Sequence, residues 1–166
     1  MVNNNQIHKP VLGFILITIL LFGCNTEQPS TLFKKVDAST SGLVFNNELI
    51  ENDSINILDN EFVYNGAGVA LGDLNGDGLD DIFLSGNQVD NKLFLNKGKL
   101  KFQEITTESG IFKTDTLMWS SGVSIIDINS DGKLDIYVCN TFRKQDSQRA
   151  NLLYVNQGNN ADGIPT

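Results

Sequence analysis

Short apolar runs separated by polar, glycine-rich turns recur along the chain beyond about residue 62. Runs of this length, rich in β-branched and aromatic side chains, predict β-strands. They fall into two groups with the same internal order. The first group predicts four strands, at about 67–72, 81–85, 92–96 and 100–106. The second predicts three strands, at about 121–126, 134–139 and 151–156.

The two groups are copies of one unit. Gly68–Gly72 aligns with Gly122–Ile126 at an offset of 54 residues, and Asn91–Gly98 aligns with Asn151–Gly158 at an offset of 60. The six extra residues fall in the polar stretch 142–149, where a loop tolerates insertion at little cost. The chain therefore contains an internal repeat.

A four-stranded unit that repeats at about 50 residues is typical of a β-propeller blade. One such sheet cannot bury both of its faces, so neighbouring blades must stack. Propellers usually have about 4–8 blades, which is more than this chain supplies. We expect an all-β propeller fragment whose second blade lacks its last strand. A small two-sheet sandwich, complete in itself, is the alternative.

An acidic loop stands between the first two predicted strands of each unit. The loops are Asp73–Asp81 and Asp127–Asp135, with oxygen-bearing side chains at positions 1, 3, 5 and 9 and glycine at position 6. This pattern suits Ca²⁺, which takes about 6–8 oxygen ligands. Position 12 is Leu84 or Val138, so the bidentate acid of an EF-hand is missing, and a strand follows in place of a helix. The sequence predicts two calcium loops that join strands.

The segments around these loops resemble the FG-GAP/VCBS-type repeat of cell-surface propellers. The residues that carry the resemblance are Tyr64–Gly78, Asn91–Gly98, Trp119–Asp135 and Arg149–Tyr154. More closely, residues 31–158 look like the N-terminal part of the bacterial cartilage-acidic-protein-like lipoproteins, which carry an ASPIC/UnbV domain further along. The resemblance implies a calcium-binding propeller similar to the integrin α-subunit head. The ASPIC/UnbV region lies outside this chain.

The resemblance also implies a ligand set for each loop. In the first loop the ligands would be the side chains of Asp73, Asn75, Asp77 and Asp81 and the carbonyl of Leu79. In the second they would be the side chains of Asp127, Asn129, Asp131 and Asp135 and the carbonyl of Lys133. Position 3 is Asn in both loops where the family pattern has Asp, so each site loses one negative charge and is expected to bind more weakly.

Residues 1–23 predict a lipoprotein signal peptide. The apolar run Val11–Phe22 is too short to span a bilayer, which takes about 20 helical residues, and suits a signal-peptide core. The run ends at Leu21–Cys24, which resembles a bacterial lipobox, so we expect Cys24 to be diacylated. An ordinary signal peptide with an incidental cysteine is the alternative. Residues 24–41 then form a tether.

Residues 42–166 are expected to hold the partial propeller, with repeat 1 at about 62–112 and a truncated repeat 2 at about 116–166. Two acyl chains would anchor the protein stably, in the bacterial cell envelope at the outer membrane or cell surface. The net charge of −8 without a basic patch argues against nucleic acid. Calcium outside the cytoplasm is plentiful enough to fill a weak site.

Few residues suggest catalysis. The one histidine, His8, lies in the predicted signal, which removes Ser–His and Cys–His pairs and the usual zinc ligands. Asp80 and Asp81 should point to opposite faces of the strand, so they make a poor acid/base pair. Trp119 is expected to pack between blades, with a sugar-stacking platform as the alternative. Cys139 is expected to be a small buried strand residue.

Two other features are interpreted structurally. Asn91 and Asn151 occupy matching places and are expected to cap turns. Phe45–Asn47 could form an extra strand that closes a ring of blades.

The sequence therefore favours a calcium-binding module that binds or scaffolds, with no catalysis of its own. Its protein or glycan ligand is not indicated. One alternative is the non-catalytic portion of a larger glycan-processing enzyme. Another is a decayed gene product that does not fold alone.

Overall fold

The structure is a computed structural model that describes residues 32–112, 117–142 and 145–166. All helices and strands among these residues lie in one unit, Val36–Thr166. The predicted signal peptide and Cys24, the predicted lipidation site, lie outside the described residues. Within the described part of the chain, no helix is both long enough and apolar enough to cross a membrane.

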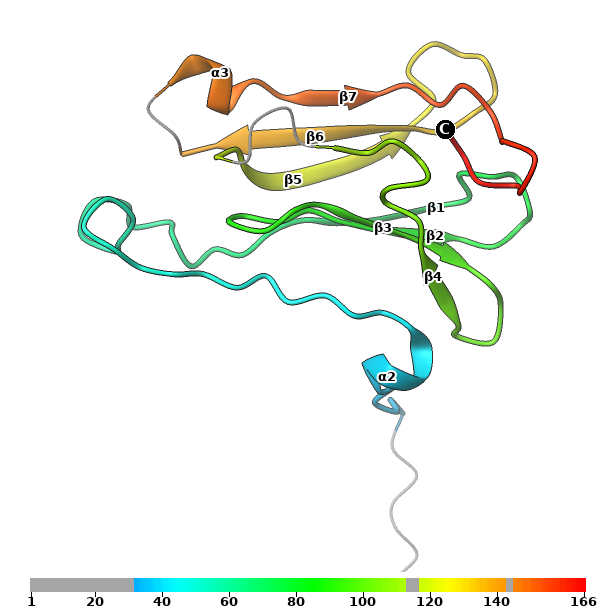
Figure 1. The fold of residues 1–166 in the computed structure, drawn as a ribbon, viewed down its shortest axis with the longest axis horizontal. Helices are drawn as coiled ribbons and strands as arrows, with labels where there is room; N and C mark the ends of the chain where they lie inside the picture. Colours follow the sequence, from blue (N-terminus) through cyan, green and yellow to red (C-terminus); the bar gives the residue numbers. More distant parts are fainter. Residues whose placement is uncertain (1–31, 113–116, 143–144) are drawn as a thin grey trace, which may run out of the picture. The chain divides into compact units, whose positions relative to one another are not determined.

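Two antiparallel sheets make up this unit, and they correspond to the two repeats (Figure 1). Sheet 1 has the order β1–β2–β3–β4, with strands β1 (Val69–Gly72), β2 (Asp81–Leu84), β3 (Lys92–Asn96) and β4 (Phe102–Glu104). Sheet 2 has the order β5–β6–β7, with strands β5 (Trp119–Ile126), β6 (Asp135–Thr141) and β7 (Leu152–Tyr154). The all-β prediction and the seven strands are confirmed, and the arrangement is that of a partial propeller.

The strand registers confirm the internal repeat. In sheet 1 Phe83 pairs with Leu93, and in sheet 2 Tyr137 pairs with Leu153. These rungs are separated by the same offsets, 54 and 60 residues, that align the two sequences. The residues of the loop between β6 and β7 that have no counterpart in repeat 1 include the short helix α3 (Asp146–Arg149).

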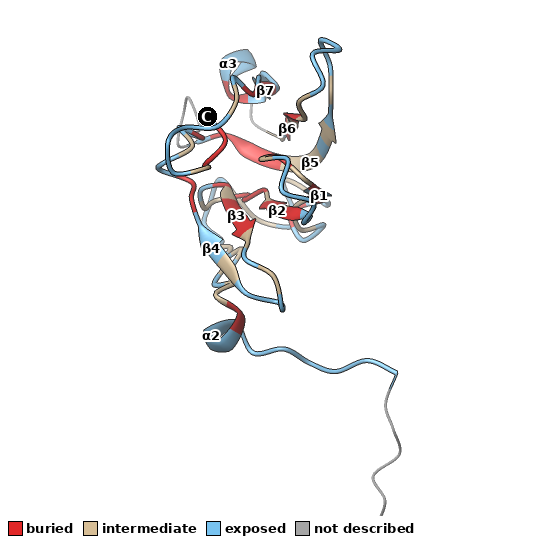
Figure 2. Cartoon of the chain, turned by 90° about the vertical axis from the view of Figure 1, so that its right-hand side faces the viewer, coloured by how far each residue is buried: buried red, intermediate tan, exposed pale blue. Residues whose placement is uncertain are grey.

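The core lies between the two sheets (Figure 2). Sheet 1 contributes Phe83, Leu93 and Leu95, all less than 3% exposed, and sheet 2 contributes Ile136 and Val138. On β2 and β6 the core residues Phe83, Ile136 and Val138 are followed by less buried ones, because successive strand side chains point to opposite faces. On β3, Phe94 between Leu93 and Leu95 is also fully buried. Stacking therefore covers one face of each sheet.

Strands β1 and β5 approach closely because glycine stands where they meet. A Cβ atom on Gly68 would lie 2.7 Å from the carbonyl oxygen of Ser121, and one on Gly72 would lie 2.8 Å from the side chain of Ile125. Both distances are shorter than real Cβ contacts, so a side chain at either position would push the sheets apart.

The stretch from Gly42 to Ile50 runs along sheet 1. Asn47 and Asn87 share two hydrogen bonds: Asn47 Nδ2 donates to Asn87 Oδ1 (2.6 Å), and the Asn87 N–H donates to Asn47 Oδ1 (2.9 Å). Asn87 also donates through Nδ2 to the Ser120 carbonyl of sheet 2 (2.9 Å). The stretch Phe45–Asn47 is not a strand in this structure, whose described residues form two sheets and no last blade for it to pair with. Side-chain amides, in place of a backbone ladder, attach this segment.

Two local expectations also change. The predicted strand 100–106 begins later, since Lys99 and Leu100 have φ of 53° and 58° and form the turn before β4. Leu100 is therefore exposed and does not share a strand face with Phe102. Within the predicted tether, residues Ala38–Ser41 form a short helix, α2, which ends at Gly42 with φ of 83°.

After β7 the chain turns back on itself. The Gln157 N–H donates to the Thr166 carbonyl (2.7 Å), and the Thr166 N–H donates to the Gly158 carbonyl (3.0 Å). Asn159 forms an isolated antiparallel bridge with Pro165. Ile164 is 8% exposed and belongs to the core between the sheets. Residues 157–166 therefore form a hairpin that packs against both repeats.

We expect Gly68→Ala to destabilise the protein by about 1–3 kcal/mol, because the new methyl group would overlap the Ser121 backbone. Urea unfolding, monitored by fluorescence, measures the change in the free energy of unfolding. The matched control is Gly122→Ala in the second repeat, where the nearest atom to a new Cβ is the Cys139 Cβ at 3.6 Å, an ordinary contact. Equal losses of stability in the two variants would contradict the proposed close approach of β1 and β5.

Candidate metal centre

The aspartate at position 9 of each acidic loop is fully buried. Asp81 and Asp135 are both 0% exposed and begin β2 and β6. Asp81 accepts the N–H of Leu74 (3.0 Å) on one oxygen and that of Asn96 (2.8 Å) on the other. Asp135 accepts the equivalent N–H groups, those of Ile128 (3.0 Å) and Asn156 (2.8 Å). Each carboxylate thus ties the start of its loop to the end of the third strand.

The aspartate at position 1 organises the middle of each loop. Asp73 Oδ1 accepts the N–H groups of Gly76 (2.8 Å) and Asp77 (3.0 Å), and Oδ2 accepts that of Gly78 (2.8 Å). Asp127 accepts the N–H groups of Asp131 (3.1 Å) and Gly132 (2.9 Å). Gly78 and Gly132 have φ of 84° and 85°, which explains the glycine at position 6 of both loops.

Positions 3 and 5 bond to each other in both loops. In the first loop Asn75 Nδ2 donates to Asp77 Oδ2 (3.1 Å), and Asn75 Oδ1 accepts the Asp77 N–H (3.1 Å). In the second loop Asn129 and Asp131 make the same two bonds at 3.2 and 3.0 Å. The position-5 carboxylates also accept the N–H of position 7, Leu79 or Lys133, at 2.9 Å.

The loops differ at position 7. The Lys133 ammonium donates to Asp131 Oδ2 at 2.8 Å, and this contact holds the pKa of the Asp131 carboxyl below its usual range. In the first loop position 7 is Leu79, which has no charge. Both members of the ion pair are partly exposed, so the pair contributes little stability. It does place a positive charge beside a candidate ligand of the second loop.

The first loop concentrates negative charge. Burial raises the pKa of the Asp81 carboxyl, the hydrogen bonds from Asn96 and Leu74 partly offset this effect, and the neighbouring Asp77 and Asp73 add to the rise. The raised pKa means that ionising Asp81 is unfavourable beside these neighbours. A cation near this group would relieve the repulsion.

The donor atoms fit Ca²⁺ in kind, although they do not converge on one point. Among residues 32–112, 117–142 and 145–166, no three His, Cys, Asp or Glu side chains form a group that could hold a metal ion. Each carboxylate is turned toward backbone N–H groups, with which an ion would compete. Asp81 uses two hydrogen bonds of the roughly four that a carboxylate can accept. The oxygen-only set is the one that Ca²⁺ prefers.

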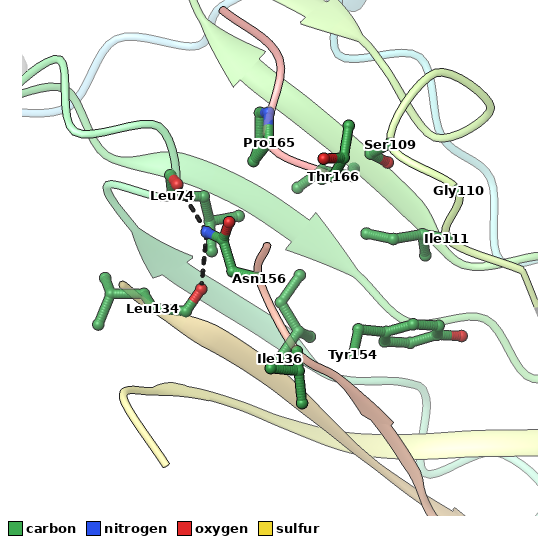
Figure 3. A pocket seen from close by; sticks show the side chains of 12 residues that line it. Leu74, Ser109, Gly110, Ile111, Leu134, Ile136, Tyr154, Asn156, Pro165 and Thr166 are labelled. Carbon is green, nitrogen blue, oxygen red and sulfur yellow. Dashed lines mark hydrogen bonds between the residues drawn. The ribbon is translucent and has the colours of Figure 1, made fainter. Parts of the chain in front are cut away.

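Two asparagines of the second repeat reach the first loop, and the sequence interpretation missed them. Asn156 Nδ2 donates to the carbonyls of Leu74 (2.9 Å) and Leu134 (3.2 Å), as the dashed lines in Figure 3 show. Asn159 Nδ2 donates to the Asn75 carbonyl (2.7 Å). One signal existed for Asn156, because it matches Asn96 in the alignment of Asn91–Gly98 with Asn151–Gly158.

The turn-capping prediction for Asn91 and Asn151 is confirmed. Asn91 Oδ1 accepts the Gly86 N–H (3.0 Å), and Asn151 Oδ1 accepts the equivalent N–H of Asn140 (3.0 Å). Each asparagine thereby fixes the connection between the second and third strands of its sheet.

The other residues considered in the sequence, Trp119, Cys139 and the Asp80–Asp81 pair, show no catalytic or sugar-binding arrangement among the described residues. Trp119 is 3% exposed and meets Phe142 edge to face, with ring centroids 4.9 Å apart, so it is a packing residue and not a sugar platform. Cys139, a free thiol, is half-buried on β6 near Gly122. Asp80 is exposed whereas Asp81 is buried, which confirms that they do not form an acid/base pair.

Comparison with known proteins agrees with this geometry. Residues 73–138, which include both acidic loops, match the FG-GAP-like repeat family. The two stacked sheets and their acidic loops agree with this match, so this part of the chain is similar to FG-GAP-like repeats. The chain is similar to cartilage acidic protein 1 of Xenopus tropicalis, with 37% identity over 71 residues. That match covers 43% of this chain and 11% of the relative, so the chain spans a small part of the relative's length.

We expect Asp81→Asn to lower the free energy of unfolding by about 1–3 kcal/mol, because the new amide group would face one of two buried N–H donors. Chemical denaturation in the presence of a chelator measures this effect apart from any ion. The control Asp80→Asn makes the same charge change at an exposed neighbour and should stay within about 0.5 kcal/mol. If the two variants were equally stable, the buried carboxylate would not be the tie described above.

Proposed function

We propose that this chain is a calcium-binding region of a surface-anchored protein and that it acts as a binding or scaffold module. The observation that carries the proposal is the shared hydrogen-bond network of the two loops. In both loops position 1 accepts the N–H groups of positions 5 and 6, positions 3 and 5 bond to each other, and position 9 accepts two buried N–H groups. These bonds recur although position 2 is Leu74 or Ile128 and position 4 is Gly76 or Ser130. The conserved feature of the repeat is therefore the placement of oxygen atoms.

Calcium would bind carboxylate oxygens that the hydrogen bonds of the turn leave partly unused, since Asp81 accepts two of the roughly four bonds it can take. Buried carboxylates are costly unless they are paired, hydrogen-bonded or bound to a metal ion. Asp81 lies close enough to Asp73 and Asp77 for their charges to raise its pKa, and a divalent cation would reverse that effect. The bound ion would hold the loop against the strand pair. Position 3 asparagines, and Lys133 in the second loop, would keep the affinity modest.

We expect Ca²⁺ to raise the melting temperature of the intact chain in a saturable way, because an ion that binds only the folded state stabilises it. The double variant Asp77→Ala/Asp131→Ala should lose most of this rise, since it removes one ligand from each loop. Differential scanning calorimetry over a Ca²⁺ titration measures both responses, and Mg²⁺ at equal concentration should give a smaller rise.

The control for that titration is Asp90→Ala/Asp162→Ala, which removes two exposed carboxylates outside the loops. Its net charge equals that of the loop variant. It should keep the full Ca²⁺ response. An unchanged response in the loop variant, or an equal loss in both double variants, would refute calcium binding at the loops.

The anchor is proposed from the N-terminal sequence. The apolar run Val11–Phe22, which ends in the lipobox-like Leu21–Cys24, supports signal cleavage and lipidation, which would hold the repeats in the bacterial cell envelope, at the outer membrane or cell surface. In that location the loops would be in contact with abundant calcium.

We expect Cys24→Ser to abolish incorporation of a labelled fatty acid and to shift the protein from the membrane to the soluble fraction of bacterial cells. The chain has two cysteines, so Cys139→Ser is the matched control and should keep label and membrane location. Labelling that survives Cys24→Ser would exclude this thiol as the lipidated group.

A further inference from the structure

The first loop is held by the second repeat as well as by its own. Its backbone carbonyls at positions 2 and 3, those of Leu74 and Asn75, accept hydrogen bonds from Asn156 and Asn159. The Asn156 bond is buried, whereas the Asn159 bond is at the surface. Both donors follow β7, on the far side of the interface between the sheets. Asn75 Nδ2 adds a longer bond in the other direction, to the Gly163 carbonyl (3.5 Å), so side-chain amides on both sides tie the loop across that interface.

These contacts connect the two buried aspartates through a continuous chain of hydrogen bonds. The Asn156 N–H donates to Asp135 Oδ1, Asn156 Nδ2 donates to the Leu74 carbonyl, and the Leu74 N–H donates to Asp81 Oδ2. Asn156 Oδ1 accepts the Gly158 N–H (2.8 Å), so this side chain is fixed at both ends. An asparagine held in this way can keep only one orientation.

In the part of the chain that the structure describes, Asn96, which matches Asn156 in the first repeat, makes hydrogen bonds only within its own sheet. Asn96 repeats the bonds within its own sheet: its N–H donates to Asp81, its Nδ2 to the Asp80 carbonyl (2.8 Å), and its Oδ1 accepts the Gly98 N–H (2.9 Å). The described structure gives it no bond to another acidic loop. The cross-repeat bond of Asn156 is therefore an addition to the motif, made where two repeats are stacked.

We infer that Asn156 and Asn159 are positioning residues for the first loop, so that ion binding there depends on the docked second repeat. This inference rests on the calcium binding proposed above. An ion that binds an ordered loop gains affinity from any contact that has already ordered it. By reciprocity, an ion in the first loop strengthens the attachment of the second repeat.

Asn159→Ala provides the clean test, because its side chain bonds to the first loop and lies at the surface. The background variant Asp131→Ala isolates the first loop, and Asp77→Ala isolates the second. By isothermal titration of the intact chain, Asn159→Ala should weaken Ca²⁺ binding about three- to tenfold in the first background. It should leave the affinity unchanged in the second background. The control Gln157→Ala, whose amide donates only to the nearby Val155 carbonyl, should change neither.

A measurement without calcium separates this inference from the calcium assignment. In chelator, the backbone amides of Gly76, Asp77 and Gly78, which donate to Asp73, should exchange about three- to tenfold faster in Asn159→Ala than in the unaltered chain. Exchange at Gly132 of the second loop should not change. If Asn159→Ala leaves Ca²⁺ binding intact, or weakens it equally in both loops, the inference about Asn156 and Asn159 is overturned and the calcium assignment stands. A chain that binds no Ca²⁺ in either background overturns both proposals.

Discussion

Two buried carboxylates, those of Asp81 and Asp135, determine how each acidic loop joins its strands. A fully buried aspartate is unfavourable unless its oxygens are satisfied. Each of these carboxylates accepts one N–H from the start of its loop and one from the end of the third strand. The loop, the second strand and the third strand must therefore be in register before the carboxylate can be buried. This requirement explains why both repeats adopt one geometry despite different residues between the motif positions.

Stacking of the sheets follows from the same units. Strands β1 and β5 meet closely through Gly68 and Gly72, and the inner faces of both sheets supply the core. Side-chain amides then tie the sheets together away from that core, at Asn87 on one side and at Asn156 and Asn159 on the other. Polar residues thus set the relative positions of the sheets, while apolar burial supplies most of the stabilisation.

Much of this arrangement could be predicted from the sequence. Strand identity followed from apolar patterning, and the repeat offsets predicted which rungs of the two sheets correspond. The left-handed backbone at Gly78 and Gly132 followed from glycine at position 6. Leu100 was misassigned because a left-handed turn at two non-glycine residues, Lys99 and Leu100, leaves no composition signal.

The candidate site was only partly predictable. The positions of the candidate ligands could be read from the spacing of acidic and amide side chains, since the motif lies within nine consecutive residues. The contribution of Asn156 and Asn159 could not be predicted. Their amides bond to backbone carbonyls, which every residue carries, at sequence separations of 82 and 84 residues. The attachment of Asn47 to Asn87 was missed for a similar reason, as amide pairs have no periodicity.

Asp81 and Asp135 hold their loops to the strands as permanent parts of the folded state. Native-state hydrogen exchange of the N–H groups of Leu74, Asn96, Ile128 and Asn156 tests it most directly. We expect these four amides to exchange as slowly as the central amides of β2 and β6, because they open only when the sheets unfold. Exchange as fast as that of the exposed loop amides would contradict it.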